Sequence, residues 1–477
     1  METNLLTKEN KNYFENEINK LVNQLINWKV NNTQVHDNCE LNNFINLEPI
    51  PQKGQELNDS IKTVINSLGK NINFSSTTFM GFPDSGNSLP GLIGGIIEVF
   101  LQQNLINKDI CSPWATEIEA NVINWLRSSN GYTSESIIND VTQLGGAVTT
   151  GGVMSNTYAL MAAKKKYPYK NIVILPDNIG HYSLSYATEW LNLDVEIIYC
   201  KTYKYRIDKN YLQKLIDKYG NRIMFIGVYA CDSMTSTCED LKGIYELIKE
   251  NNLETWIHCD ACHGFVLNFS TEYKNKVSYL SKFDSCTLDP HKVLWLPYTM
   301  SVILMKNPDD FARLSRGASL IMDDPLSFGK TTPFIGSKSF DSLKLWMVMK
   351  TIGVQNLGEM IEKRIKNAKY FYEKITNSDH FSVENDEIIY SVIFQYLPLQ
   401  NLSQEKINEL NRQIYNKMIS DGKYYFHGFS INVEGTDKFV LRYNSGNINI
   451  SNDEIRSAML YVEKLGKEIF YDKNRIN

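Results

Sequence analysis

The chain has 477 residues, of which 43% are hydrophobic, so it can bury a large core, and its length allows about two or three domains. A formal net charge of -5 and a pI near 5.9 argue against the basic surface of a nucleic-acid-binding protein. No apolar run approaches the length of a transmembrane helix, and residues 1–31 lack the apolar core of a signal peptide. We therefore expect a cytoplasmic protein that binds neither nucleic acid nor membranes and keeps its cysteines reduced.

The first predicted element is an N-terminal helix over residues 7–30. Its apolar side chains recur at helical spacing among charged residues, at Phe14, Ile18, Leu21, Val22, Leu25 and Ile26. Residues 32–60 are polar and are interrupted by Pro49 and Pro51, which favours a loop. A further helix is expected after Ser112-Pro113, with Thr116 as its N-cap and an apolar stripe behind it.

From about residue 145 to residue 305, short β-rich runs alternate with segments of helical periodicity. The expected strands are 172–175, 195–199, 222–229, 256–260, 285–288 and 300–305, with helices such as 208–219 and 239–251 between them. This alternation predicts an α/β fold with a mainly parallel sheet that helices cover on both faces. From about residue 351 the composition shifts to charged helices and a few strands, which indicates a small C-terminal domain.

Two of the predicted strands end in side chains that suggest a specific chemistry. The strand 256–260 ends in the carboxylate of Asp260, and the strand 285–288 leads through Asp289-Pro290 to His291 and Lys292. A desolvated lysine amine can form a Schiff base with a carbonyl. A buried aspartate can keep a pyridine nitrogen protonated. Pyridoxal 5'-phosphate (PLP) has both partners, a carbonyl for the lysine amine and a pyridine nitrogen for the aspartate.

A pair of glycines, Gly151 and Gly152, precedes a helix that is predicted to run to about Lys166. Glycines at such a place let backbone N–H groups approach a phosphate, and the N-terminus of the helix favours its charge. The pair fits neither the Walker A pattern nor the dinucleotide-binding fingerprint. Taken alone, such a pair of glycines is more often an ordinary turn than a phosphate site.

Residues 259–263 also satisfy C-x-x-C-H, the attachment pattern of c-type haem. A haem site would require export and a distal axial ligand in a small helical fold. In this chain the pattern continues a strand-like run of an α/β sequence. We therefore interpret it as the end of a buried strand.

Together these segments resemble the group II PLP-dependent decarboxylases, a family that includes aromatic L-amino-acid, glutamate and tyrosine decarboxylases. The resemblance rests on Asp-Pro-His-Lys at 289–292, Asp-Ala at 260–261, Gly-Gly-x-x-Ser-Asn at 151–156 and Ser-Pro-x-x-Thr-Glu at 112–117. These motifs occur in the family's order within roughly residues 75–445. The resemblance implies PLP as cofactor and the PLP-dependent transferase-like fold of type I, with a seven-stranded-type sheet.

The resemblance also implies three parts of the chain. Residues 1–87 would form an N-terminal helical segment that wraps around the partner subunit of a homodimer. Residues 88–350 would form the large PLP-binding domain, and residues 351–477 a small α+β domain.

Catalytic roles are implied for three residues. Lys292 would hold PLP, Asp260 would pair with its pyridine nitrogen, and His181 would stack on the ring and act in proton transfer. The full set of implied cofactor contacts is Gly152, Val153, His181, Ser233, Asp260, Asp289, His291 and Lys292. The implied substrate contacts are Phe82, Pro83 and Arg442, and no metal site is expected.

The sequence departs from the family in three places. Thr77-Thr78 stands where a His-Pro pair is usual, and Asp232-Ser233-Met234 replaces a Gly-Thr-Thr run. In the loop between Phe311 and Thr332, the animal and plant aromatic decarboxylases carry a Tyr that reprotonates the α-carbon. This chain has no Tyr between Tyr298 and Tyr370.

The activity implied is decarboxylation of an L-amino acid, a small-molecule substrate with an aromatic one favoured, to the amine and CO₂. Two alternatives keep the cofactor: oxidative deamination to an aldehyde, as in relatives whose loop Tyr is replaced by Phe, and decarboxylation of an acidic amino acid. A non-catalytic scaffold is a third alternative, against which the presence of both Asp260 and Lys292 argues.

Overall fold

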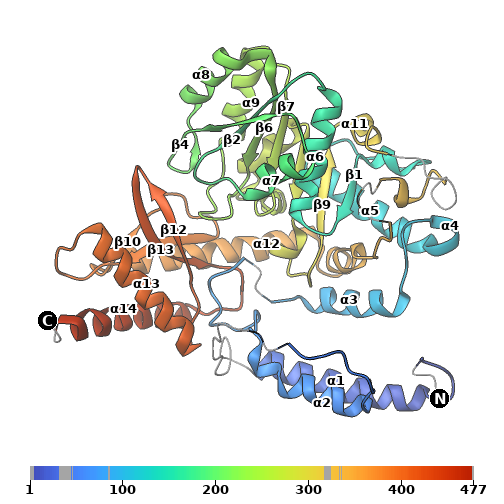
Figure 1. Ribbon diagram of the computed structural model, residues 1–477, viewed down its shortest axis with the longest axis horizontal. Helices are drawn as coiled ribbons and strands as arrows, with labels where there is room; N and C mark the ends of the chain where they lie inside the picture. The colour runs from blue at the N-terminus through green and yellow to red at the C-terminus, as the bar shows by residue number, and fades with distance from the viewer. Residues whose placement is uncertain are drawn as a thin grey trace.

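The computed structural model describes residues 5–31, 45, 47–83, 86–315, 324–331, 334 and 336–474. A seven-stranded sheet forms its centre, in the order β1-β9-β8-β7-β6-β2-β3 (Figure 1). The strands are β1 (Gly146–Thr149), β2 (Ile172–Pro176), β3 (Glu196–Cys200), β6 (Ile223–Tyr229), β7 (Trp256–Asp260), β8 (Ser285–Leu288) and β9 (Ser301–Met305). The five strands from β3 to β8 run parallel, and β9 pairs antiparallel with both β8 and β1. The predicted α/β class with a mainly parallel sheet is confirmed.

Helices cover both faces of this sheet because its central strands are apolar on both sides. In β2, Ile172 and Ile174 pack into one core, while Val173 and Leu175 pack into the other. Successive side chains of a strand point to opposite faces, so a strand between two layers reads as a continuous apolar run. The first core includes α5 (Pro113–Ser129), α8 (Lys209–Tyr219), α9 (Leu241–Glu250) and α12 (Ser342–Thr376), and the second includes α6 (Gly152–Lys166), α7 (Tyr182–Trp190) and α11 (Pro308–Ala312).

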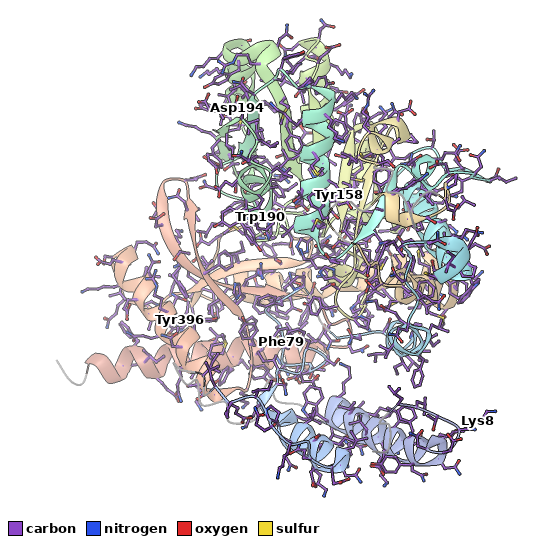
Figure 2. All side chains as sticks on the ribbon, turned by 45° about the vertical axis from the view of Figure 1, so that its right-hand side comes forward. Lys8, Phe79, Tyr158, Trp190, Asp194 and Tyr396 are labelled. Carbon is purple, nitrogen blue, oxygen red and sulfur yellow. The ribbon has the colours of Figure 1, made fainter. Side chains whose placement is uncertain are left out.

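A second, four-stranded antiparallel sheet has the order β10-β11-β13-β12. Its strands are β10 (Phe381–Val383), β11 (Ser391–Tyr396), β12 (His427–Val433) and β13 (Thr436–Asn444), and α13 (Gln404–Asp421) and α14 (Asn452–Asn474) lie beside them. Tyr396 is buried in the core of this smaller sheet, and Tyr158 of α6 is buried in a core of the seven-stranded sheet (Figure 2). The helix α12 leads into this unit and is kinked at Gly353, whose φ is 79°.

The N-terminal helices lie apart from both sheets in Figure 1, with α1 (Lys11–Asn31) beside α2 (Leu57–Asn66) and below α3 (Leu89–Leu101). The predicted helix over 7–30 is therefore found, although α2 already begins within the segment that was expected to be a loop. None of the helices among the described residues is both long and apolar enough to cross a membrane.

Other elements are short: α4 (Lys108–Cys111), α10 (Pro290–Val293), and the hairpin β4 (Thr202–Tyr203) and β5 (Arg206–Ile207). One detail of the sequence interpretation is wrong. The N-cap of α5 is Ser112 and not Thr116, because Pro113, which needs no hydrogen bond for a backbone N–H, occupies the first helical position.

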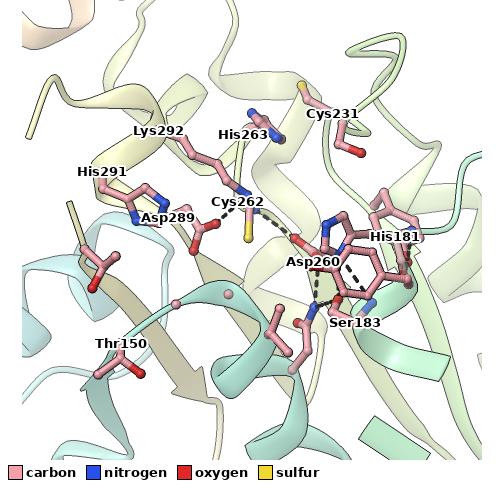
Figure 3. Close-up of a pocket in the computed structure, with 18 of the residues that line it drawn as sticks. Thr150, His181, Ser183, Cys231, Asp260, Cys262, His263, Asp289, His291 and Lys292 are labelled. Carbon is pink, nitrogen blue, oxygen red and sulfur yellow. Dashed lines mark hydrogen bonds and ion pairs between the residues drawn. The ribbon is translucent and has the colours of Figure 1, made fainter. Parts of the chain in front are cut away.

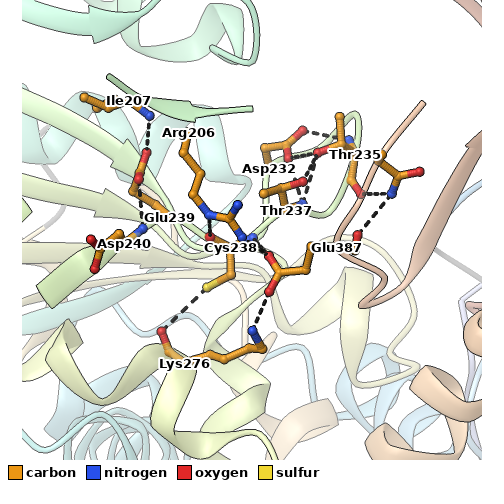
Figure 4. Close-up of polar contacts among 11 residues, drawn as sticks. Arg206, Ile207, Asp232, Thr235, Thr237, Cys238, Glu239, Asp240, Lys276 and Glu387 are labelled. Atoms are coloured by element: carbon orange, nitrogen blue, oxygen red, sulfur yellow. Dashed lines mark hydrogen bonds and ion pairs between the residues drawn. The ribbon is translucent and has the colours of Figure 1, made fainter. Parts of the chain in front are cut away.

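The two sheets are joined by polar contacts around Glu387, just before β11 (Figure 4). Its carboxylate lies 2.7 Å from Arg206 Nη2, accepts the N–H of Cys238 at 2.9 Å, and pairs with the ammonium of Lys276. Asp232 accepts N–H groups of its own loop, including those of Thr235 at 2.7 Å and Thr237 at 2.9 Å. The loop after β6 is thus fixed from both sides, and the same loop forms one wall of the cavity described next.

Candidate active site

A cavity of about 310 Å³ lies at the carboxyl edge of the seven-stranded sheet (Figure 3). All eight cofactor contacts expected from the sequence line it: Gly152, Val153, His181, Ser233, Asp260, Asp289, His291 and Lys292. They come from the end of β7 and from the segments that follow β1, β2, β6 and β8. Clefts at the carboxyl ends of parallel strands are where open α/β sheets bind ligands.

The amine of Lys292 forms an ion pair inside this cavity. Its Nζ is 2.6 Å from Asp289 Oδ2, and the same carboxylate accepts the hydroxyl of Ser301. Burial alone lowers the pKa of Lys292, but Asp289 outweighs it, so the pKa lies above its usual value. Burial works on Asp289 in the opposite sense, and Lys292 and His291 hold its pKa well below the usual range. The sequence suggested a desolvated amine, whereas the structure shows a paired ammonium.

Asp260 ends β7 with only 6% of its surface exposed. Asn156 Nδ2 donates to its Oδ2 at 2.9 Å, and the N–H of Cys262 donates to its Oδ1 at 3.2 Å. Two donors on two different oxygens are the bonding pattern that suits a carboxylate.

His181 is the N-cap residue of α7. Its Nδ1 accepts the N–H of Ser183 at 3.3 Å and lies 2.9 Å from the Ser183 hydroxyl. The backbone N–H of His181 donates to the hydroxyl of Tyr229 at 2.9 Å. Burial lowers the pKa of the imidazole, Asp260 opposes this effect and Lys292 adds to it. The ring is therefore neutral at neutral pH.

The opposite end of the cavity is suited to an anion. Gly152 and Val153 begin α6, a helix of 15 residues, and helix N-termini attract negative charge. His291 lies on the same side, with Nδ1 2.6 Å from the carbonyl of Met300. An amine, a carboxylate and an anion-binding helix end in one cavity match the aldehyde, pyridine nitrogen and phosphate of PLP, so the residues present fit this cofactor.

The structure explains why residue 152 is a glycine. A Cβ at this position would lie 2.9 Å from Asp289 Oδ2 and 3.1 Å from Cys262 Sγ. Lys292 and Ser301 bind the Asp289 carboxylate, so it could move away from such a Cβ only by losing these contacts.

We therefore expect Gly152→Ala to lower the unfolding free energy of the cofactor-free protein by about 1–3 kcal/mol, the usual cost of overpacking. Gly151→Ala is the matched control, because a Cβ there meets no atom within 4 Å and the φ of 165° is extended backbone. Urea unfolding of both variants measures the difference. Equal stability of the two would contradict the close contact.

The structure does not bring the predicted substrate contacts into the cavity wall. Arg442 is buried in β13, where Nη2 donates to the carbonyl of Gly81 at 3.0 Å and Nη1 donates to the carbonyl of Ser233. Its guanidinium lies 6.0 Å from the ring centre of Phe82. Arg442, with Phe82 beside it, thus forms a layer behind Ser233, which does line the cavity, whereas Phe82, Pro83 and Arg442 do not.

Several lining residues were not anticipated from the sequence as site residues. They are Thr150, Gly151, Asn156, Tyr182, Ser183, Tyr229, Cys231, Cys262, His263, Tyr298 and Thr299. Asn156 and Cys262 belong to motifs that were noticed, but their contacts depend on neighbours distant in sequence. Of the loop between Phe311 and Thr332, residues 316–323 and 332 lie outside the described residues. The absence of a loop Tyr therefore stays an observation on the sequence.

Comparison with known proteins agrees with this geometry. The family model described as the pyridoxal-dependent decarboxylase conserved domain matches residues 45–397. The chain is 24% identical to an aromatic-L-amino-acid decarboxylase of Bacillus atrophaeus, over 88% of each chain. It is also 24% identical to a phenylacetaldehyde synthase of Petunia hybrida, over 74% of each.

A solved structure of TDC from Oryza sativa with PLP and tryptamine has the same fold, with a TM-score of 0.85 at 18% identity, covering 98% of this chain and 100% of the other. The fold expected from the sequence, PLP fold type I with a small C-terminal sheet domain, is confirmed. Because the family model covers most of the chain, the protein belongs to the pyridoxal-dependent decarboxylases and is a PLP-dependent carboxy-lyase.

Proposed function

We propose that the protein decarboxylates an aromatic L-amino acid to the corresponding amine. The observation that carries this proposal is the meeting of Lys292, Asp260 and His181 in one cavity at the carboxyl edge of the sheet. These three side chains come from three different strand ends. Their convergence supplies an amine, a charge partner and a proton-bearing ring within one pocket.

Bound PLP supplies an electron sink for the pair that stays on the α-carbon when CO₂ leaves. In this proposal Lys292 would bind the aldehyde carbon, and Asp260 would accept a hydrogen bond from the pyridine nitrogen. Gly152, Val153 and His291 would hold the phosphate. Ser233 would offer its hydroxyl to the phenolic oxygen.

Asp289 orients the amine of Lys292. Because this carboxylate keeps the pKa of Lys292 high, the free side chain of Lys292 would be an ammonium. The ion pair of 2.6 Å with Asp289 would hold it in place inside the cavity.

His181 is proposed to return a proton to the α-carbon. Its Nδ1 accepts the N–H of Ser183, so the proton of the neutral ring resides on Nε2. This assignment gives the reprotonation step a donor within the described residues that does not depend on a loop Tyr.

The substrate class is inferred from weaker observations. The Bacillus relative is named an aromatic-L-amino-acid decarboxylase, and the layer behind Ser233 contains the aromatic rings of Phe82 and Phe429 beside Arg442. Substrate contact by Phe82, Pro83 and Arg442 stays a prediction. An acidic amino acid remains the second substrate class.

One alternative outcome is favoured by a specific observation. The chain has no Tyr between Tyr298 and Tyr370, and the Petunia relative is named a phenylacetaldehyde synthase. In the alternative, the amino acid reacts with O₂ and water, O₂ accepts two electrons, and the products are an aldehyde, CO₂, ammonia and hydrogen peroxide.

Product analysis separates the two outcomes. Purified holoenzyme is incubated with L-tyrosine, L-phenylalanine, L-tryptophan and L-glutamate, in air and under nitrogen, and amine, aldehyde and peroxide are quantified. We expect the amine of an aromatic substrate without peroxide in both atmospheres. Aldehyde with stoichiometric peroxide, formed only in air, would replace the proposal by its alternative.

We also propose that the protein is a cytoplasmic homodimer with parts 1–87, 88–350 and 351–477. Support for the dimer comes from apolar side chains exposed on the N-terminal helices, namely Leu25, Ile26 and Val30 of α1 and Leu89, Ile96, Val99 and Phe100 of α3. Exposed apolar surface of this kind marks interfaces. Sedimentation equilibrium of the holoenzyme tests the assembly.

A further inference from the structure

A series of buried polar side chains runs behind the cavity, from the start of β7 to its end. Trp256 Nε1 donates to Ser285 Oγ at 2.8 Å, and Ser285 Oγ lies 2.7 Å from His258 Nδ1. His258 Nε2 lies 3.0 Å from Asn156 Oδ1, and Asn156 Nδ2 donates to Asp260 Oδ2 at 2.9 Å. None of the five residues is more than 6% exposed.

The two ends of this series fix the direction of every hydrogen bond in it. An indole N–H only donates, and a carboxylate only accepts. Asn156 must therefore turn its NH₂ towards Asp260 and its oxygen towards His258. That oxygen requires a proton on His258 Nε2, and His258 Nδ1 is left to accept the hydroxyl proton of Ser285, whose oxygen accepts from Trp256.

A branch carries the same direction to His181. Asn156 Nδ2 also donates to Ser183 Oγ at 2.7 Å, so the Ser183 hydroxyl is free to donate its own proton to His181 Nδ1, 2.9 Å away. The N–H of Ser183 points at the same nitrogen. The Asn156 side-chain NH₂ thus donates one hydrogen to the Asp260 carboxylate and the other to the Ser183 hydroxyl, which lies beside His181.

We propose that Asn156 is a positioning residue that sets the orientation of the Asp260 carboxylate and of the Ser183 hydroxyl beside His181 Nδ1, and that His258 positions Asn156. The inference rests on the proposed roles of Asp260 and His181 and deepens them. Asn156 acts through its two neighbours, and its own orientation is imposed from Trp256 through His258.

The alternative is that His258 is an ordinary core residue. Burying an imidazole in a core destabilises the fold unless both ring nitrogens form hydrogen bonds. Burial lowers the pKa of His258 to about 4, although Asp260 opposes the shift, so the ring stays neutral and keeps one donor and one acceptor. The ring of Phe225, 5.6 Å away, packs beside it. A neutral ring with one fixed tautomer can pass the hydrogen-bond direction from Ser285 to Asn156, and we call this directed series of hydrogen bonds the relay.

Histidine nitrogen NMR of the cofactor-free protein tests the relay directly. The chain has 7 histidines, and ¹⁵N-histidine labelling with His181→Gln and His258→Gln variants assigns the two signals. We expect both rings as neutral Nε2–H tautomers. A proton on His258 Nδ1 in the wild type would overturn the proposal at once.

Asn156→Leu provides the decisive variant. Leucine fills a similar volume but has no hydrogen to donate to Asp260 or Ser183. We expect a shifted ¹⁵N signal of His181 Nδ1, because the Ser183 hydroxyl beside it loses its own donor, and about tenfold weaker PLP binding, the effect of one lost charge-assisted hydrogen bond. An unchanged His181 signal with unchanged PLP affinity would refute the role of Asn156.

The matched control is Asn411→Leu in α13. Asn411 is equally buried, and its amide donates to the carbonyls of Tyr396 at 3.0 Å and Ile407 at 2.9 Å. This variant loses comparable buried hydrogen bonds far from the cavity. It should lower stability and leave the His181 signal and the PLP affinity as in the wild type.

A pair of variants at His258 separates positioning from packing. Glutamine can present an N–H near the place of His Nε2, whereas methionine fills similar volume without a donor. PLP affinity within about threefold of the wild type for His258→Gln, with about tenfold weaker binding for His258→Met, would support the relay. Equal losses in both variants would contradict it. Because tautomers and PLP affinity are measured without turnover, these results stand apart from whether the protein proves to be an aromatic decarboxylase.

Discussion

Lys292→Ala is expected to abolish decarboxylation and the visible absorbance of the purified protein. Without the amine no covalent link to the cofactor aldehyde forms, and loss of a covalent catalytic group typically lowers kcat on the order of 10⁴-fold or more. The variant also leaves the Asp289 carboxylate buried without its ammonium partner, which lies 2.6 Å away in the wild type. Absorbance spectra with added PLP and the kcat for the substrate found by product analysis measure the effect.

Two control variants separate chemistry from stability in this experiment. Lys292→Arg keeps a cation beside Asp289 but has no amine that forms a Schiff base, so it should fold well and stay inactive. Lys292→Ala combined with Asp289→Asn removes the unpaired charge, and we expect it to regain stability without activity. A visible band that survived in Lys292→Ala would show that another amine binds the cofactor.

The large sheet could be foreseen because its central strands are apolar on both faces and lie between helices with clear periodicity. The strand β1 was missed, since Gly146 to Thr149 is too short and too small in side chains to stand out from its surroundings. The expected edges of β2, β6 and β7 differ from the observed ones by one residue or less. Burial on both faces, rather than local propensity, determines these strands.

The site itself was predicted in part, for a physical reason. Asp260, Lys292 and Gly152 stand at the ends of elements, where the sheet topology brings them together whatever the details of packing. Arg442 is different, because its contacts to the carbonyls of Gly81 and Ser233 connect segments that only the folded chain brings together.

The electrostatic state of the site was also beyond the sequence. Lysine pKa values fall on burial and rise beside a carboxylate, so the sign for Lys292 depended on whether Asp289 would face it. The 2.6 Å ion pair determines that sign. For the same reason the direction of the hydrogen bonds behind Asp260 required the positions of Trp256 and Ser285.

Asp260→Asn is expected to lower kcat/KM by roughly 10²- to 10³-fold, as when a preorganised charge partner is removed from an active site. An amide does not balance a positive charge on the cofactor's pyridine nitrogen, so the electron sink weakens. The amide also changes the bonding to Asn156, because its NH₂ can face the NH₂ that donates to Asp260 in the wild type. Steady-state kinetics, with PLP content measured in parallel, give the loss.

Asp260→Glu and Asp284→Asn make the result specific. Glutamate keeps the charge but displaces it by one methylene, so part of the activity should return. Asp284 lies at the opposite edge of the same sheet, where its Oδ2 accepts the N–H of Ile257 at 2.8 Å, so Asp284→Asn should affect stability and leave kcat/KM within about threefold. Near wild-type activity of Asp260→Asn would mean that the pyridine nitrogen needs no carboxylate here. The decarboxylation would then depend on the groups around Lys292 and on His181, and Asp260 would serve the structure of the cavity alone.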